Sequence, residues 1–60
     1  MKQGDKVTYK TLFKTEKGII KSMSNGYAFV VYHCGGDWDN YQNYTAARTE
    51  VTDLVKGWPE

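Results

Sequence analysis

The dipeptide Asn25-Gly26 restricts the possible folds of this chain more than any other feature. Asparagine and glycine both tolerate a positive φ, which a type I′ turn requires at its two central positions. The residues that follow, 27–33, are almost entirely aromatic or β-branched, which favours a pleated sheet. The pattern predicts a β-hairpin across residues 18–34. In a short chain this hairpin must form the centre of the sheet.

The other extended segments are short and are separated by polar connections. Val7, Tyr9 and Thr11 alternate with polar neighbours, which is typical of a strand with one solvated face. Residues 45–54 also have apolar positions at helical spacing, but three threonines and a valine favour a strand there. We expect strands at residues 6–11, 18–23, 27–33 and 45–51, a helical turn at 52–54, and a last strand over 55–58 that ends at Pro59.

The length and composition predict one domain, residues 1–60. Hydrophobic residues make up 40% of the chain and aromatic residues 15%, as in globular proteins. No apolar run approaches the roughly 20 residues of a membrane span, so no membrane partner is expected. The first residues lack the apolar core of a signal peptide, and the single Cys34 cannot form an internal disulfide. Both observations favour a cytoplasmic protein, which we expect to be a monomer or a weak homodimer.

Short strands, a tight central hairpin and a late helical turn together predict an all-β fold. A small closed or nearly closed barrel would hide the edge strands that an open sheet exposes. The order of these features resembles the SH3-like barrel superfamily, in particular its Tudor and KOW-type members. The resemblance is carried by residues 4–7 (Gly-Asp-Lys-Val), 18–20 (Gly-Ile-Ile), 28–32 (Ala-Phe-Val-Val-Tyr) and 51–54 (Val-Thr-Asp-Leu). It implies a single SH3-like barrel of four to five antiparallel strands with a short terminal helical turn.

A second resemblance lies in the aromatic segment after the hairpin. Residues 32–34 (Tyr-His-Cys), 37–38 (Asp-Trp), 41 (Tyr) and 44–47 (Tyr-Thr-Ala-Ala) are similar to those of small uncharacterised phage or prophage proteins. The resemblance implies no established activity. A phage protein of this kind would be expected to modulate host machinery.

Both faces of the predicted hairpin are apolar, so the register of its strands decides which face is buried. Counting outward from the turn pairs Ser24 with Tyr27, Ser22 with Phe29, and Ile20 with Val31. The core is then expected to consist of Ile20, Phe29 and Val31 with Val7, Ala47, Val51 and Leu54. Tyr32 would lie on the other face, either exposed or covered by aromatic side chains of the loop at 35–44.

The sequence contains no convincing catalytic or metal-binding pattern. His33 and Cys34 are neighbours, and adjacent residues of a strand point to opposite faces, which separates a thiol from an imidazole. The acidic segment from Asp37 fails the calcium-loop pattern, because Gln42 stands where glycine is needed and Arg48 where a bidentate glutamate is needed. One cysteine and one histidine do not make a zinc site. We therefore expect no enzyme activity, metal or cofactor.

The strongest functional signal is a group of aromatic and acidic residues in and beside the loop at 35–44. The expected binding site consists of Tyr32, Asp37, Trp38, Asp39, Tyr41 and Tyr44. Trp and Tyr are enriched at binding hot spots because they combine a rigid apolar ring with a polar tip. With nearby carboxylates such rings can hold a cationic side chain, and they can also line a groove for a peptide. The alternative is that these rings only complete a small core.

Lysines in the first half of the chain make nucleic-acid binding the alternative function. Residues 1–24 carry a net charge of +4 and residues 25–60 a net charge of −3. The side chains that would contact phosphate are Lys6, Lys10, Lys14, Lys21 and Arg48. The total charge is only +1, and the carboxylates of the aromatic loop would repel phosphate. We therefore prefer a protein or peptide partner.

Overall fold

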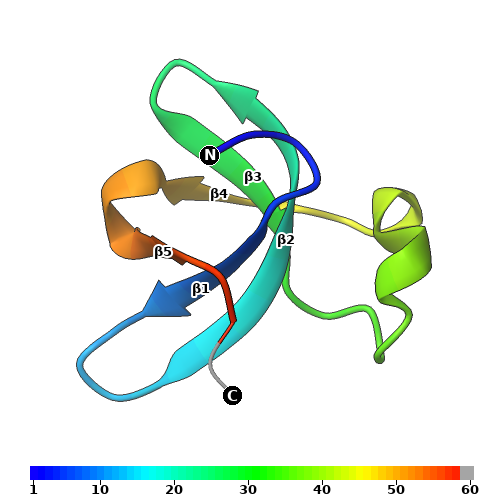
Figure 1. Ribbon diagram of the computed structural model, residues 1–60, viewed down its shortest axis with the longest axis horizontal. Coiled ribbons are helices and arrows are strands. Elements are labelled where there is room, and N and C mark those ends of the chain that lie inside the picture. Colours follow the sequence, from blue (N-terminus) through cyan, green and yellow to red (C-terminus); the bar gives the residue numbers. More distant parts are fainter. Residues whose placement is uncertain (59–60) are drawn as a thin grey trace.

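The computed structural model describes residues 1–58, which form one five-stranded antiparallel sheet with two short 3-10 helices. The elements are β1 (Lys6–Lys10), β2 (Thr15–Ser24), β3 (Tyr27–Val31), η1 (Trp38–Asn43), β4 (Ala47–Glu50), η2 (Val51–Asp53) and β5 (Leu54–Lys56). The sheet order is β4-β3-β2-β1-β5, so the last strand returns to pair with the first (Figure 1). The expected all-β class is confirmed. Pro59, expected to end the last strand, lies outside the described residues.

The central hairpin forms around the dipeptide that predicted it. Asn25 has φ 44° and Gly26 has φ 86°, the positive values that a two-residue turn of this kind requires. Ser24 pairs with Tyr27, and Ser22 pairs with Phe29, as expected. The hairpin and its turn are therefore confirmed.

The register changes further along the hairpin. Between Ile20 and Ser22 the pairing shifts by one residue, and Lys21 has no partner on β3. Ile20 therefore pairs with Val30, and the expected pairing with Val31 is wrong. An extra residue of this kind, a β-bulge, bends a strand and increases its twist. β2 is the longest strand and curves through the middle of the sheet, with β1 paired to its first half and β3 to its second (Figure 1).

The core lies on the face that carries Ile20 and Val30. It consists of Val7, Ile20, Ala28, Val30 and Leu54, with Tyr9, Tyr32 and Val51 packed against it. Three expected members, Val7, Ile20 and Leu54, are confirmed. The placement of Phe29 and Ala47 in the core is wrong, because Phe29 is half-buried and Ala47 is exposed. Alternation from Val30 turns Phe29 to the opposite face.

The opposite face of the sheet buries a second group of apolar side chains. Ile19 and Val31 pair across β2 and β3 and are 5% and 0% exposed, yet neither belongs to the core cluster. Val31 is buried as expected, but the register shift directs its side chain away from Ile20, so it lies outside the main core cluster. Cys34, just after β3, is also buried. The connection to β4 covers this side, since its helix η1 packs against β2.

The remaining boundaries differ from the expected ones by a few residues. The polar residues 15–17 belong to β2 and are not part of a connection. The helix considered for residues 45–54 is excluded, because this segment contains β4, the short helix η2 and the start of β5. The helical turn expected at 52–54 is found at Val51–Asp53. The loop expected at 35–44 contains η1, which the composition of the loop did not predict.

Gly18 allows the chain to pack tightly where β1 and β2 meet the core. A methyl group at this position would meet the Val30 side chain and would come within 3.0 Å of Tyr32 Cδ1. Cβ atoms are essentially never found so close to another heavy atom. Glycine at this position therefore lets Val30 and the Tyr32 ring lie directly over the backbone of β2.

We expect Gly18→Ala to lower the free energy of unfolding by about 1–3 kcal/mol, because overpacking displaces well-packed neighbours. Urea denaturation followed by circular dichroism measures the change. The control is the double variant Gly18→Ala/Val30→Ala, in which the smaller side chain relieves the main clash. The two substitutions should then be clearly non-additive. Strict additivity would show that the contact with Val30 is not the cause.

Candidate functional site

The acidic and aromatic loop that the sequence indicated is held together by its own hydrogen bonds. Tyr44 Oη donates to Asp37 Oδ2 at 3.1 Å, and Asn40 Nδ2 donates to Asp37 Oδ1 at 2.9 Å. The bond to the Asp37 carboxylate raises the pKa of the Tyr44 phenol. Both carboxylate oxygens of Asp37 are therefore already engaged, whereas Asp39 is exposed in the first turn of η1.

Trp38 lies against a residue at the far end of the chain. Its ring centroid is 4.9 Å from that of Trp58, with an interplanar angle of 54°. Trp58 Nε1 donates to the carbonyl oxygen of Gly18 at 2.9 Å, which fixes this ring on β2. The Nζ atoms of Lys6 and Lys17 lie 4.9 and 5.5 Å from the Trp58 ring centroid. We call these four side chains, Trp38, Trp58, Lys6 and Lys17, the indole patch.

Tyr32 is separated from Trp38 by its place on the core side of the sheet. Its hydroxyl shares a hydrogen bond of 2.8 Å with the Thr49 hydroxyl, and its ring centroid lies 6.0 Å from that of Tyr9. Tyr41 is half-buried, with its hydroxyl beside Gly4 near the N-terminus. The sequence-predicted site residues therefore do not form one continuous surface.

The cationic side chains proposed as the alternative site are also dispersed. Lys14 Nζ lies 3.3 Å from Glu16 Oε1, and Lys21 Nζ donates to the carbonyl oxygen of Tyr44 at 2.9 Å. The Arg48 guanidinium lies 4.8 Å from the Tyr27 ring centroid. Lys6 belongs to the indole patch, and Lys10 lines a groove of about 290 Å³ beside it. Of the five side chains, Lys10 and Arg48 line described grooves, and these grooves are different ones.

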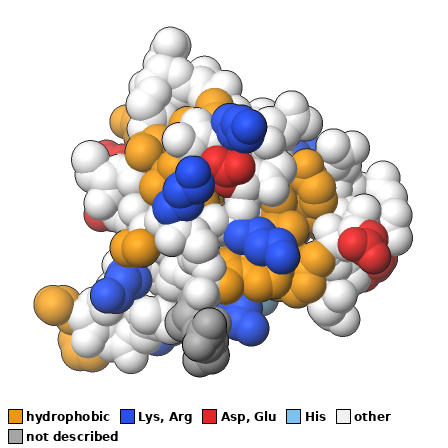
Figure 2. All heavy atoms as spheres, in the orientation of Figure 1, with side chains coloured by type: hydrophobic (Ala, Val, Ile, Leu, Met, Phe, Trp, Pro, Cys, Tyr) orange, Lys and Arg blue, Asp and Glu red, His pale blue; other side chains and the backbone are white. Residues whose placement is uncertain are grey.

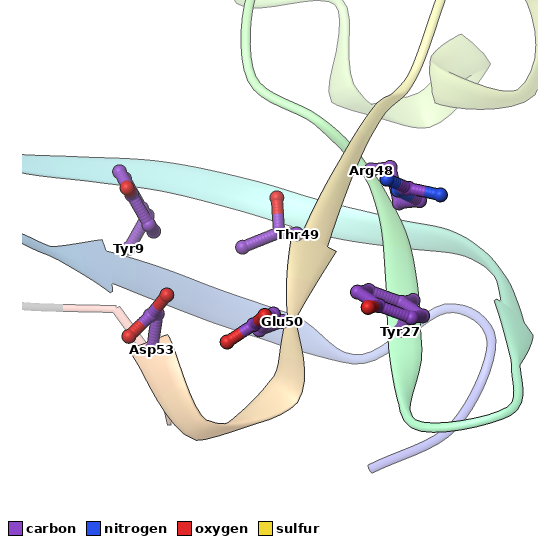
Figure 3. A pocket seen from close by; sticks show the side chains of 6 residues that line it. All are labelled: Tyr9, Tyr27, Arg48, Thr49, Glu50 and Asp53. Atoms are coloured by element: carbon purple, nitrogen blue, oxygen red, sulfur yellow. The ribbon is translucent and has the colours of Figure 1, made fainter.

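A different groove brings aromatic and acidic side chains together. Its volume is about 300 Å³, and it is lined by Tyr9, Tyr27, Arg48, Thr49, Glu50 and Asp53. Tyr9 and Asp53 lie on one side, Tyr27 and Arg48 on the other, and Thr49 and Glu50 of β4 between them (Figure 3). We call it the tyrosine groove.

The carboxylates of the tyrosine groove are the groups available for a ligand. Glu50 and Asp53 are exposed, and neither forms an ion pair with another residue in the range 1–58. Arg48, the cation of the groove, is placed over Tyr27 instead. Sequence reasoning missed this site because its residues come from β1, β3, β4 and η2, and no short motif connects them.

Tyr32 is linked to this groove by the hydrogen bond between its hydroxyl and Thr49. Burial raises the pKa of the Tyr32 phenol, the hydrogen bond with Thr49 partly opposes this effect, and Tyr9 and the negative charges of Glu16 and Asp53 raise it further. These carboxylates make the surroundings of the ring favourable for a cation and unfavourable for a phenolate.

The neighbouring histidine and cysteine differ in their exposure. Cys34 is buried and His33 is exposed, with His33 Nε2 3.9 Å from Glu16 Oε1. In the part of the chain that the structure describes, no three His, Cys, Asp or Glu side chains are grouped as metal ligands. No helix within residues 1–58 has the length and apolar character needed to cross a membrane.

Comparison with known proteins identifies no relative: no protein-family model matches the chain, and neither a curated protein nor a solved structure matches it significantly. The resemblance of residues 32–47 to phage or prophage proteins therefore stays a prediction, as do the cytoplasmic location and the monomeric or weakly dimeric state. The fold and the side-chain geometry carry the functional argument.

The raised pKa of Tyr32 predicts a loss of stability at high pH. The unfolded chain releases the phenol proton near pH 10.0, whereas the native state retains it to a higher pH. The unfolded state is therefore increasingly favoured as the pH rises above 10. We expect the free energy of unfolding to fall more steeply there in the wild-type protein than in Tyr32→Phe. Urea denaturation at a series of pH values measures both slopes, and equal slopes would contradict the prediction.

Proposed function

We propose that this protein is a non-enzymatic binding module with an SH3-like barrel fold, and that it binds a segment of a protein or peptide. The strand order supports the fold, because an antiparallel meander of four strands is followed by the short helix η2 and by a fifth strand that pairs with β1. The bend of β2 at its bulge brings the two ends of such a sheet toward each other.

The tyrosine groove is the observation that carries the proposed function. Two tyrosine rings flank two exposed carboxylates in a groove with a volume of about 300 Å³. A lysine or arginine of a partner can pair with Glu50 and Asp53 while its aliphatic stem lies along a ring. The placement of the Arg48 guanidinium over Tyr27 is an internal example of the same contact. The ligand that fits this chemistry is therefore an exposed basic peptide segment.

The tyrosine groove suits this ligand better than the loop at 37–44. In that loop the Asp37 carboxylate accepts hydrogen bonds from Asn40 and Tyr44, so a ligand cation would have to compete with them. Trp38 packs against Trp58. In the groove, by contrast, the carboxylates have no such partner among the described residues.

Charge removal in the tyrosine groove tests this function. The probe is a short glycine-rich peptide with a single arginine, and its affinity is measured by chemical-shift titration. We expect Glu50→Gln and Asp53→Asn each to weaken binding about fivefold, since exposed ion pairs contribute up to about 1 kcal/mol.

Asp39→Asn is the matched control for this titration, because it removes an exposed carboxylate from η1 and leaves the tyrosine groove intact. Its affinity for the peptide should remain that of the wild type. If Asp39→Asn weakened binding while the two groove variants did not, the loop would be the site.

Nucleic-acid binding is the second candidate function, and the indole patch favours it. Two ammonium groups flank the Trp58 ring, and the adjoining groove is lined by Thr8, Lys10, Thr15, Val55, Lys56, Gly57 and Trp58. This lining contains two lysines and no carboxylate. Lysines beside an aromatic ring suit single-stranded nucleic acid, because the lysines neutralise its phosphates and its bases can stack on the ring.

An oligothymidine titration at several salt concentrations tests this second candidate. If the indole patch contacts phosphates, Lys6→Gln/Lys17→Gln should reduce the dependence of log affinity on log salt by about 0.7 for each lysine. Lys14→Gln is the control, because Lys14 is paired with Glu16. Oligothymidine that does not bind the wild type at low salt would exclude this function.

A further inference from the structure

The turn between β1 and β2 carries the most exposed large hydrophobic residues described. Leu12 is 96% exposed and Phe13 is 94% exposed. Other exposed apolar residues, such as Val55 at 49% and Met23 at 39%, are still partly covered. Two adjacent, fully exposed apolar side chains contribute nothing to the packing of this protein, so their presence needs another explanation.

The backbone of this turn is ordered without any help from these two side chains. Thr11 N donates to the carbonyl oxygen of Lys14 at 2.9 Å, and Thr11 Oγ1 donates to the same oxygen at 3.0 Å. The Thr11 hydroxyl also accepts from the backbone N–H of Phe13 and of Lys14, at 3.3 and 3.0 Å. The turn therefore holds Leu12 and Phe13 outward in a defined geometry.

Positive charge surrounds the apolar tip. Lys10 and Lys14 flank it in the chain, and Lys17 follows on β2; Glu16, the one carboxylate among residues 10–17, pairs with Lys14. Figure 2 shows hydrophobic side chains projecting at the lower left, where Figure 1 places this turn, with lysine or arginine side chains next to them. The tip is thus apolar at its end and cationic around its base.

No groove described in this chain suits the tip of a second copy. The tyrosine groove is lined mainly by charged and hydroxyl-bearing side chains, which would lose their solvation against Leu12 and Phe13. The other two grooves carry cations that would repel the lysines of the tip. Lys10 and Lys56 line the groove beside the indole patch, and Arg48 lines the groove formed with Ser24, Asn25, Tyr27 and Phe29. The apolar end of the tip and the lysines beside it fit an occupant that is apolar inside and negatively charged at its surface.

We propose that the β1–β2 turn docks this protein onto the surface of an anionic lipid bilayer. Leu12 and Phe13 enter the boundary between headgroups and acyl chains, while Lys10 remains at the level of the anionic headgroups. A bilayer accepts a convex apolar tip without any complementarity of shape. This contact departs from the sequence-based expectation of no membrane partner. That expectation rested on the absence of a long apolar run, and a peripheral contact needs no membrane span.

Vesicle co-sedimentation of the whole chain at low salt tests the proposal. The probes are vesicles of phosphatidylcholine alone and of phosphatidylcholine with an equal amount of phosphatidylserine. We expect the wild type to bind the mixed vesicles and Leu12→Ser/Phe13→Ser to lose at least about tenfold in partitioning, because two buried apolar side chains are removed. Lys10→Gln should lower the partitioning about fivefold.

Met23→Ser is the matched control, since it removes a partly exposed apolar side chain near the hairpin turn at the opposite end of β2 (Figure 1). It should partition as the wild type does. As a second measurement, Phe13→Trp places an indole in the tip, and brominated lipid in the mixed vesicles should quench this variant more strongly than the wild type, which has only Trp38 and Trp58.

Three results would overturn the proposal. The first is a wild-type protein that does not bind the mixed vesicles. The second is binding that depends on Lys10 but not on Leu12 and Phe13, which would be electrostatic adsorption only. The third is a tip that fails to bind lipid yet is required for capture of a protein from a lysate, which would assign the tip to an apolar pocket of a protein partner.

Discussion

The register shift at Lys21 is the constraint on which the rest of the structure depends. Because one extra residue enters β2, Ile20 faces Val30 in the core while Ile19 faces Val31 on the opposite side. The strand bends at this point, and its two halves pair with different neighbours. Lys21 has no partner residue on β3, and its side chain donates a hydrogen bond to the carbonyl oxygen of Tyr44. This bond connects the end of η1 to the sheet.

Segments packed on its two sides explain how a small sheet can bury apolar side chains on both faces. The inner face, which carries Ile20 and Val30, is covered by β5 and by η2, which bring Leu54 and Val51 to the core. The outer face is covered by η1 and by Trp58, whose indole donates to Gly18. The aromatic residues of the loop that looked like a free binding surface are therefore partly needed to cover the outer face.

Local patterns in the sequence predicted local structure well. The Asn25-Gly26 dipeptide favours the turn geometry that is observed, and the alternation of apolar and polar residues indicated where most strands lie. The bulge at Lys21 could not be predicted. A polar residue within a strand looks the same in the sequence whether it pairs with a residue of the next strand or is an inserted residue without a partner. The tyrosine groove could not be predicted either, since Tyr9, Glu50 and Asp53 become neighbours only when β5 returns to β1 and carries η2 beside it.

The fold converts the charge asymmetry of the sequence into separate surfaces. Lysines of the first half gather on β1, β2 and their turn, whereas Glu50 and Asp53 of the second half lie in the tyrosine groove. The groove and the Leu12–Phe13 tip share no residue. A chain with a net charge of +1 thus presents a groove with two exposed carboxylates and, apart from it, a lysine-flanked apolar tip.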